Sequence, residues 1–168
     1  EEDVSWSENF VPWKFKDDSS SPSSPSGRSV EFNFSSGSAS RIAPYQVRWD
    51  YDQKENVYRR VSGNKQLLDL NTGQQISAKN VLLLFMSLSR ANDGYIEEGL
   101  GTHLLYGTKG QGRAKFLLDG QILDGSWLKE SRTDRTQFID SQNQEIKLNR
   151  GLIWIEILPV GQEIKVDL

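Results

Sequence analysis

Two aspartates, each followed by glycine, come nearest to catalytic chemistry in this sequence. They are Asp119 and Asp124 in the stretch LLDGQILDGSW, residues 117–127. A glycoside hydrolase needs two carboxylates a few ångströms apart across a sugar ring. Asp-Gly is also the pair that tight turns select, because such turns require positive φ. We expect both aspartates to turn the chain. The alternative is a hydrolase that takes its two carboxylates from Asp119, Asp124, Asp134 and Asp140.

Trp127 closes the same stretch and is a better candidate for ligand contact. A tryptophan offers a large amphipathic surface with little rotamer freedom, which suits stacking on a sugar or on a partner's side chain. Packing in a core is the commoner use of such a residue. Lys129 follows two positions later, so in a strand the two side chains share one face. We therefore predict that Trp127 and Lys129 belong to a binding surface.

Two further motifs favour structure over chemistry. GTKGQG, residues 107–112, lacks the GK[ST] ending of a phosphate loop, and Arg113 opens what reads as a strand. Phosphate and dinucleotide loops need a helix N-terminus aimed at the anion, so a hairpin loop is predicted instead. His103 is the one histidine, and we expect it to be a hydrogen-bonded structural residue.

A charged cluster has an equally simple interpretation. Asp50 and Asp52 lie on one predicted strand, and Arg59 and Arg60 lie on its predicted neighbour. Opposite charges on adjacent strands are explained by cross-strand pairing without any function.

The composition excludes several classes of protein. The 168 residues are about one domain. The 20 Lys and Arg against 23 Asp and Glu give a net charge of −3, which argues against a nucleic-acid binder. The absence of cysteine excludes disulfides, thiol nucleophiles and thiolate zinc sites, and we expect neither a metal nor a cofactor. No apolar run approaches the roughly 18 residues of a membrane span, so the sequence predicts a soluble domain.

Alternation of apolar and polar residues predicts strands through most of the chain. It is clearest in YQVRWDYD, residues 45–52, and NVYRRV, residues 56–61, reads as its hairpin partner. The nearly continuous apolar run NVLLLFMSLS, residues 80–89, predicts a strand buried on both faces at the centre of the core. Further strands are predicted over VEFNF, HLLYG, RAKFLLDG, QFIDSQNQEIKL with a turn at Asp140–Asn143, LIWIEILPV and EIKVDL. These nine or ten strands predict a mainly β domain with little helix, as a single antiparallel β-sandwich or open barrel.

Residues 1–29 differ from the rest of the chain. Aromatic residues are scattered among polar ones without a period, and the Ser/Pro-rich run KDDSSSPSSPSG follows. Such a run buries too little surface to offset its ordering entropy, so we predict a flexible linker. We divide the chain into residues 1–29, the tail of a preceding domain with its linker, and residues 30–168, a β-rich C-terminal domain.

Three stretches in a fixed order resemble a known family. They are YQVRWDYDQKENVYRR, LLDLNTGQQISAKNVLLL and GRAKFLLDGQILDGSWLKESRTDRTQFIDSQNQEIKLNRGLIWIEILP. Over roughly residues 30 to 160 the chain resembles the C-terminal half of the YerB-like lipoproteins, a bacterial family of unknown function. The resemblance implies export, tethering to the outer face of the cell membrane by a lipidated cysteine, and an N-terminal domain before the region matched. The positions that match the family pattern and could form a surface are Tyr58, Arg59, Asp69, Asn80, Asp119, Trp127, Lys129 and Trp154.

We expect most of these positions to be structural and four of them to contact a ligand, namely Tyr58, Arg59, Trp127 and Lys129. The expected function is a non-catalytic binding or scaffolding module of an exported, lipid-anchored bacterial protein. Its partner would be an envelope protein or a cell-wall glycan, and not a nucleic acid. The alternatives are the hydrolase described above and a purely structural domain that supports an N-terminal half.

Overall fold

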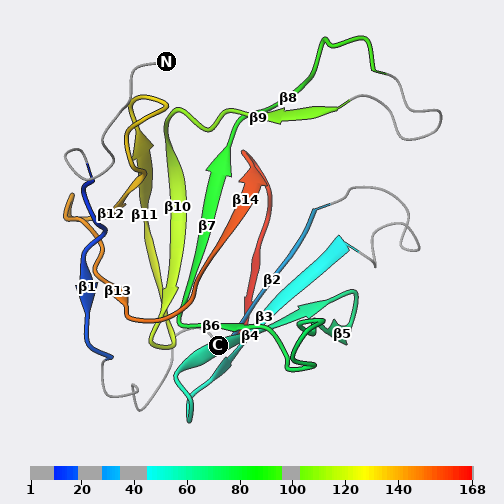
Figure 1. Ribbon diagram of the computed structural model, residues 1–168, viewed down its shortest axis with the longest axis vertical. Coiled ribbons are helices and arrows are strands. Elements are labelled where there is room, and N and C mark those ends of the chain that lie inside the picture. Colours follow the sequence, from blue (N-terminus) through cyan, green and yellow to red (C-terminus); the bar gives the residue numbers. More distant parts are fainter. Residues whose placement is uncertain (1–9, 19–27, 35–44, 96–102, 168) are drawn as a thin grey trace.

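The computed structural model describes residues 10–18, 28–34, 45–95 and 103–167. All the regular elements in these residues are strands, and no helix occurs among them (Figure 1). The strands are β1 (Phe15–Lys16), β2 (Ser29–Asn33), β3 (Gln46–Asp52), β4 (Val57–Ser62), β5 (Lys65–Gln66), β6 (Ser77–Ala78), β7 (Asn80–Met86), β8 (Leu88–Arg90), β9 (Leu104–Tyr106), β10 (Gly110–Leu118), β11 (Gln121–Lys129), β12 (Gln137–Asp140), β13 (Leu148–Asn149), β14 (Ile153–Pro159) and β15 (Lys165–Asp167). The prediction of a mainly β fold is confirmed.

Two larger sheets carry the fold. The first has the strand order β12-β11-β10-β7-β14, and the second has the order β15-β2-β3-β4-β5, with β6 also paired to β4. The strands of the second sheet run obliquely to those of the first, and the two sheets do not close into a barrel (Figure 1). Two short pairs, β1 with β13 and β8 with β9, complete the described structure.

Strand β7 lies at the centre of the core, as its sequence predicts, but it ends at Met86 and not at Ser89, because Leu88 and Ser89 belong to the exposed strand β8. All seven of its residues are buried, because β10 and β14 flank its edges and apolar side chains cover both of its faces. Val81, Leu83 and Phe85 point into a core shared by the two sheets. Leu82, Leu84 and Met86 point into a second core on the other face. A strand buried on both faces has no polar side to show, which explains its unbroken apolar run.

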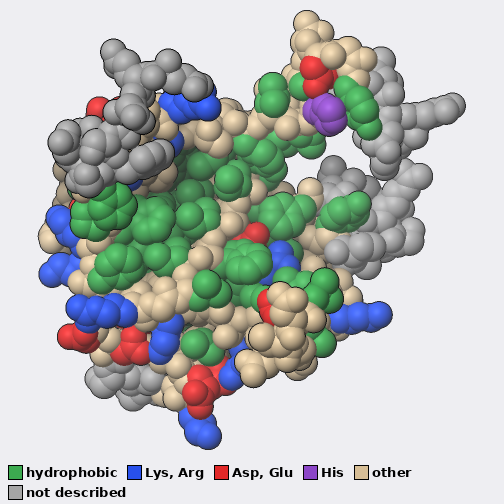
Figure 2. All heavy atoms as spheres, viewed as in Figure 1, with side chains coloured by type: hydrophobic (Ala, Val, Ile, Leu, Met, Phe, Trp, Pro, Cys, Tyr) green, Lys and Arg blue, Asp and Glu red, His purple; other side chains and the backbone are tan. Residues whose placement is uncertain are grey.

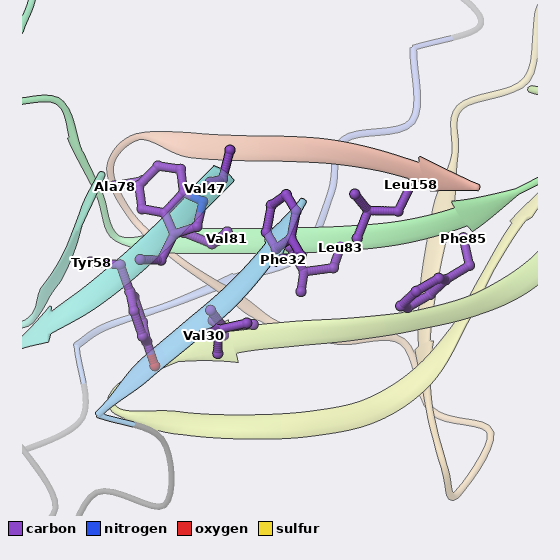
Figure 3. Close-up of a cluster of buried hydrophobic side chains, with 11 residues drawn as sticks. Val30, Phe32, Val47, Tyr58, Ala78, Val81, Leu83, Phe85 and Leu158 are labelled. Atoms are coloured by element: carbon purple, nitrogen blue, oxygen red, sulfur yellow. The ribbon is translucent and has the colours of Figure 1, made fainter. Parts of the chain in front are cut away.

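The shared core consists of apolar side chains from both sheets that pack against one another. Figure 3 shows Tyr58 and Ala78 at one end of this cluster and Phe85 at the other. Beside it, Trp49 packs edge to face on Trp154, with ring centroids 5.5 Å apart. Trp154 of the first sheet therefore faces the second sheet, which agrees with the structural role expected for most of the family positions.

Two pairings depart from the antiparallel arrangement that we expected. Strand β14 lies parallel to β7, with Ile155 beside Leu82, and β1 lies parallel to β13. Several pieces of only two or three residues also raise the strand number above nine or ten. The period-two pattern tells which face of a strand is buried, but it does not specify which strand lies beside it or in which direction.

The described part of the N-terminal segment packs on the β-rich region. The indole nitrogen of Trp13 donates to the carbonyl of Thr136 at 2.7 Å, and its ring lies 5.3 Å from that of Phe138. Residues 10–18 thus lie against the first sheet. The rest of the predicted tail, residues 1–9, and the predicted linker over residues 19–27 lie outside the described residues, as do residues 35–44, 96–102 and 168.

Asp119 and Asp124 have different roles, and only one of them turns the chain. Asp119 and Gly120 have φ values of 51° and 72° and form the tight turn between β10 and β11. The prediction that Asp124 also turns the chain is wrong, because it lies inside β11 opposite Lys115. The turn predicted at Asp140–Asn143 is confirmed: the Asp140 carboxylate accepts hydrogen bonds from the backbone of Gln142 and Gln144.

Strands β8 and β9 form an arm that projects from the first sheet (Figure 1). Figure 2 shows His103, in purple, near the end of this arm. Its Nδ1 lies 2.8 Å from the Asp93 carboxylate, and its ring stacks on Tyr95 with centroids 4.0 Å apart. The prediction of a hydrogen-bonded structural histidine is confirmed.

Candidate functional site

A groove of about 990 Å³ opens between the two larger sheets. One wall consists of β10 and the residues that follow β7, and the other consists of β2 and the connection from β14 to β15. Figure 2 shows hydrophobic side chains gathered over the first sheet and charged ones mainly around its rim. The groove is the concave site to which the polar residues of both sheets contribute.

The sequence of β10 explains why the sheets part here. Its odd positions face the second sheet, and they change from Leu117, which belongs to the shared core, to Lys115, Arg113 and Gln111. Charged and amide side chains cannot be buried without partners, so the apolar core ends at this point. Phe85 remains as the last core residue and lines the groove.

Arg113 is the most distinctive side chain in the groove. Its guanidinium carbon lies 5.4 Å from the centroid of the Phe85 ring. Such a contact holds the planar group over an apolar surface while its edge remains able to donate hydrogen bonds. Because a guanidinium matches a carboxylate or phosphate with two parallel bonds, this geometry suits an anion.

The other cations of the groove differ in their partners. Lys115 lies 2.6 Å from the Asp124 carboxylate, and Lys165 lies 4.0 Å from that of Glu31. Among the residues that the structure describes, no carboxylate pairs with Lys109 or Arg113. Lys109 and Arg113 are therefore the groove cations without a described carboxylate partner, and Glu163 is the groove carboxylate without a described cation partner.

Amide side chains supply further polar groups to the groove. They come from four separate segments, and each can both donate and accept hydrogen bonds. The four are Asn33, Gln46, Gln111 and Gln162. Ser87 adds a hydroxyl beside Phe85. Amides around an apolar floor are the groups that recognise hydroxyl and acetamido substituents of a sugar.

Trp127 does not offer the exposed ring that we expected for ligand stacking. Its side chain is 2% exposed, and its indole nitrogen donates to the Phe85 carbonyl at 2.9 Å. The ring lies over Gly112, where an added Cβ would be only 2.5 Å from the indole nitrogen. Trp127 borders the groove but acts as packing between β7, β10 and β11. Lys129 contacts the backbone carbonyl of Asp134.

Tyr58 and Arg59 lie on the other sheet and face opposite ways. Tyr58 is fully buried in the shared core, where its hydroxyl donates to the Gln121 carbonyl at 3.3 Å and burial raises the pKa of its phenol. Arg59 binds the Asp52 carboxylate at 2.9 Å, and this bond lowers the pKa of Asp52. The structure thus does not bring the four predicted ligand contacts together.

The cross-strand explanation of the charged cluster holds for only one pair. Asp52 and Arg59 pair as expected. Asp50 instead pairs with Arg48 of its own strand at 2.8 Å, and Arg60 pairs with Glu156 of the first sheet at 3.0 Å. Glu156 is buried, and the long-range pairing of Arg60 could not be found from neighbouring strands alone.

Asp119 is the centre of a structural network. Its carboxylate accepts hydrogen bonds from Lys16 at 2.5 Å, from Asn56 at 2.9 Å and from Asn149 at 2.8 Å. Burial by itself would raise the pKa of Asp119, but these three donors outweigh it and lower the pKa. Asn80 extends the network by accepting a bond from the Asn149 backbone at 2.7 Å. A carboxylate so fully bonded is suited to holding segments together and not to transferring protons.

The four aspartates of the hydrolase alternative do not meet in one cleft. Asp119 is held in its network, and Asp124 shares a face with Lys115. Asp140 lies opposite Gly125, one position from Asp124, so it belongs to the other face of the sheet. None of the four, Asp134 included, lines the groove. Asp69 likewise stabilises a turn by accepting from the Thr72 backbone at 2.8 Å.

The groove residues were visible in the sequence but were not selected. Lys109 and Arg113 belong to the rejected phosphate-loop motif or follow it directly, and rejecting that motif was correct because a strand follows it. The hairpin loop predicted there is wrong, because residues 110–112 lie in β10, and β10 pairs with β7 and β11 and not with the preceding β9. The available signal was the alternation of Gln111, Arg113 and Lys115 with the apolar side of β10. These three polar residues occupy successive positions on one face of a strand that belongs to a core-forming sheet. Such a pattern indicates that this face is open to solvent there.

The family is decided by the comparisons. A family model described as the C-terminal domain of a protein of unknown function, DUF3048, matches residues 38–155. The chain belongs to this family. The YerB protein from Bacillus subtilis has a similar crystal structure, with a TM-score of 0.70 and 17% sequence identity. The match covers 92% of this chain and 47% of that one, so the chain spans about half the length of YerB.

These comparisons confirm the resemblance to the YerB-like family and extend no further than fold and family. No curated protein matches the chain significantly. Within the described residues, no helix is long and apolar enough to cross a membrane. No group of three or more histidines and carboxylates that could hold a metal ion gathers there either.

Proposed function

We propose that this domain is a non-catalytic binding module of an exported, membrane-tethered bacterial protein, and that it binds cell-wall glycan in the groove between its two sheets. The observation that carries the proposal is the groove itself, which brings apolar residues, the buried Phe85 and the exposed Val160 among them, together with amides from four segments. Ligand sites in proteins are concave, largely apolar and equipped with a few placed polar groups. A binding role needs nothing more than these groups.

The distribution of acids and bases favours binding over hydrolysis. The aspartates considered for hydrolysis lie outside the groove, and His103 lies on the arm. A glycosidase needs two carboxyl groups about 5 to 10 Å apart across the bound sugar. The groove holds two carboxylates among the described residues. Glu31 lies 4.0 Å from Lys165, and Glu163 has no ion pair in the described part of the chain.

Co-sedimentation with purified cell-wall sacculi tests the proposal. We would compare the native protein with Gln111→Trp, which fills the groove from an exposed strand position, and with Gln66→Trp, an exposed strand position of the second sheet outside the groove. Saturable binding by the native protein and by Gln66→Trp, but not by a folded Gln111→Trp, is expected. Failure of the native protein to sediment would contradict the proposal, and equal binding by both variants would move the site away from the groove.

A protein partner in the cell envelope is the second candidate. The observation in its favour is the β8–β9 arm, where Leu104 and Leu105 are 57% and 54% exposed. Exposed apolar residues that lie close together often mark a protein contact. Replacing both leucines with serine would weaken capture of such a partner and leave sedimentation with sacculi unchanged.

A further inference from the structure

We infer that the ligand brings an oxyanion into the groove, a carboxylate or phosphate of an anionic wall polymer, and that Arg113 and Lys109 bind it. This inference rests on the proposed function, because it names the class of glycan polymer that occupies the same site. Both cations line the groove, and they lie four positions apart at the start of β10.

The environment of Arg113 distinguishes it from the three arginines of β3 and β4. Arg48, Arg59 and Arg60 each bind a carboxylate of this chain within 3.0 Å. Arg113 lies over the Phe85 ring instead, and no described carboxylate neutralises it. An aromatic contact fixes the plane of a guanidinium but does not use its fork of N–H donors. The donors of Arg113 are therefore available to a ligand.

The groove also has side chains that can bind the neutral groups of such a polymer. Gln111 precedes Arg113 on the same face of β10, and Asn33 and Gln46 lie on the opposite wall. Amides next to a cation can bind hydroxyl or acetamido groups while the cation binds the acidic substituent. A polymer that carries both kinds of group matches the lining better than a neutral glycan.

The experiment measures binding of the full chain to four probes. Intact sacculi carry phosphate polymers as well as peptidoglycan carboxylates, sacculi treated with hydrofluoric acid keep only the carboxylates, and chitin oligosaccharides are neutral. Soluble polyglutamate serves as an anion without sugar. The variants are Arg113→Gln, Arg113→Lys, which keeps the charge but not the fork, and Arg150→Gln, an exposed arginine outside the groove.

The expected result is that Arg113→Gln weakens binding to sacculi about tenfold or more, that Arg113→Lys is intermediate, and that Arg150→Gln is unchanged. The native protein and all three variants should bind the chitin oligosaccharides only weakly. Equal binding to intact and treated sacculi would identify a carboxylate, and binding to intact sacculi alone would identify a phosphate.

Two outcomes would overturn the inference and separate it from the proposed function. If chitin binds as tightly as intact sacculi, or if Arg113→Gln binds sacculi like the native protein, the anion contact is wrong although glycan binding stands. If no sacculi bind, the proposed function fails. In that case polyglutamate tests the anion site by itself. The inference is supported if the native protein binds polyglutamate and Arg113→Gln binds it more weakly. The inference is overturned if both proteins bind polyglutamate equally or if neither binds it.

Discussion

Lys16 and Asp119 stand 103 positions apart in the chain, and the ammonium nitrogen of one lies 2.5 Å from the carboxylate oxygen of the other. Through this bond β1 is fastened to the turn between β10 and β11. Asn56 joins the same carboxylate to the turn after β3, and Asn149 joins it to β13. One buried carboxylate thus connects four segments that lie far apart in the sequence.

Asp119→Asn should remove the part of the pH dependence of the free energy of unfolding that comes from this carboxylate. The folded pKa of Asp119 is lowered, while an unfolded aspartate titrates near about 3.9. Its contribution is therefore complete above the unfolded value and is lost as the pH falls through the lower folded value. At neutral pH the variant should lose about 3 kcal/mol, because Lys16 loses its charged partner.

Urea unfolding between about pH 3 and about pH 7 measures this difference. Asparagine also tolerates positive φ, so the turn itself should persist in the variant. The difference between the free energies of unfolding of the two proteins should become smaller as the pH falls toward the acid end of this range. A difference that stays constant over the whole range would show that ionised Asp119 is not what the network depends on.

Gly112→Ala should destabilise the first sheet by displacing Trp127. The new Cβ would lie 2.5 Å from the Phe85 carbonyl oxygen and 2.5 Å from the indole nitrogen, so the bond between these two groups could not form. Overpacking with loss of one hydrogen bond should cost about 2 to 4 kcal/mol. Chemical denaturation measures the loss, with the exposed Gln111→Ala as the control. An unfolding free energy equal to that of the native protein would contradict the packing role of Trp127.

The buried pair of Arg60 and Glu156 should show strong coupling in a double-mutant cycle. Glu156 accepts from Arg60 at 3.0 Å and from the Trp49 indole at 3.1 Å, and Arg60 also lies over the Trp154 ring. Glu156→Gln or Arg60→Met alone leaves a buried charge without its partner and should cost about 3 to 5 kcal/mol. The double variant should cost much less than the sum. Additive losses would mean that the two charges do not depend on each other.

Asp124→Asn should have almost no effect on stability. Its ion pair with Lys115 is solvent-exposed on the aspartate side, and such pairs contribute about 0 to 1 kcal/mol. Binding to sacculi should not be weakened, because Asp124 does not line the groove and its replacement leaves Lys115, which does, without a negative partner. A large loss of activity on any glycan substrate in this variant would revive the hydrolase alternative.

The strands could be predicted because burial leaves a period in the sequence. The alternation of Val47 and Trp49 with polar neighbours marked β3, and the unbroken run from Asn80 to Met86 marked β7. The Asp119-Gly120 turn followed from the backbone geometry that this pair adopts easily. The turn predicted at the second Asp-Gly pair was wrong, because Asp124 fits a strand equally well when Lys115 lies opposite.

The arrangement of the strands around the site could not be predicted, because it depends on contacts between residues that are far apart in the sequence. The parallel register of β14, the pairing of Arg60 with Glu156 and the network of Asp119 all join residues that are distant in the sequence. Trp127 was chosen because tryptophan suits ligand stacking, but the absence of a side chain at Gly112 lets its ring be buried. A groove between two sheets becomes visible only when the second sheet is in place.

The most direct test of the groove as the binding site uses the absence of cysteine in this sequence. Gln111→Cys and Gln66→Cys each create one thiol, which can carry an environment-sensitive fluorophore inside or outside the groove. Titration with solubilised wall fragments should change the emission of the label at position 111 saturably and leave the label at position 66 unaffected. No change at position 111 while the protein still sediments with sacculi would contradict the assignment of the groove.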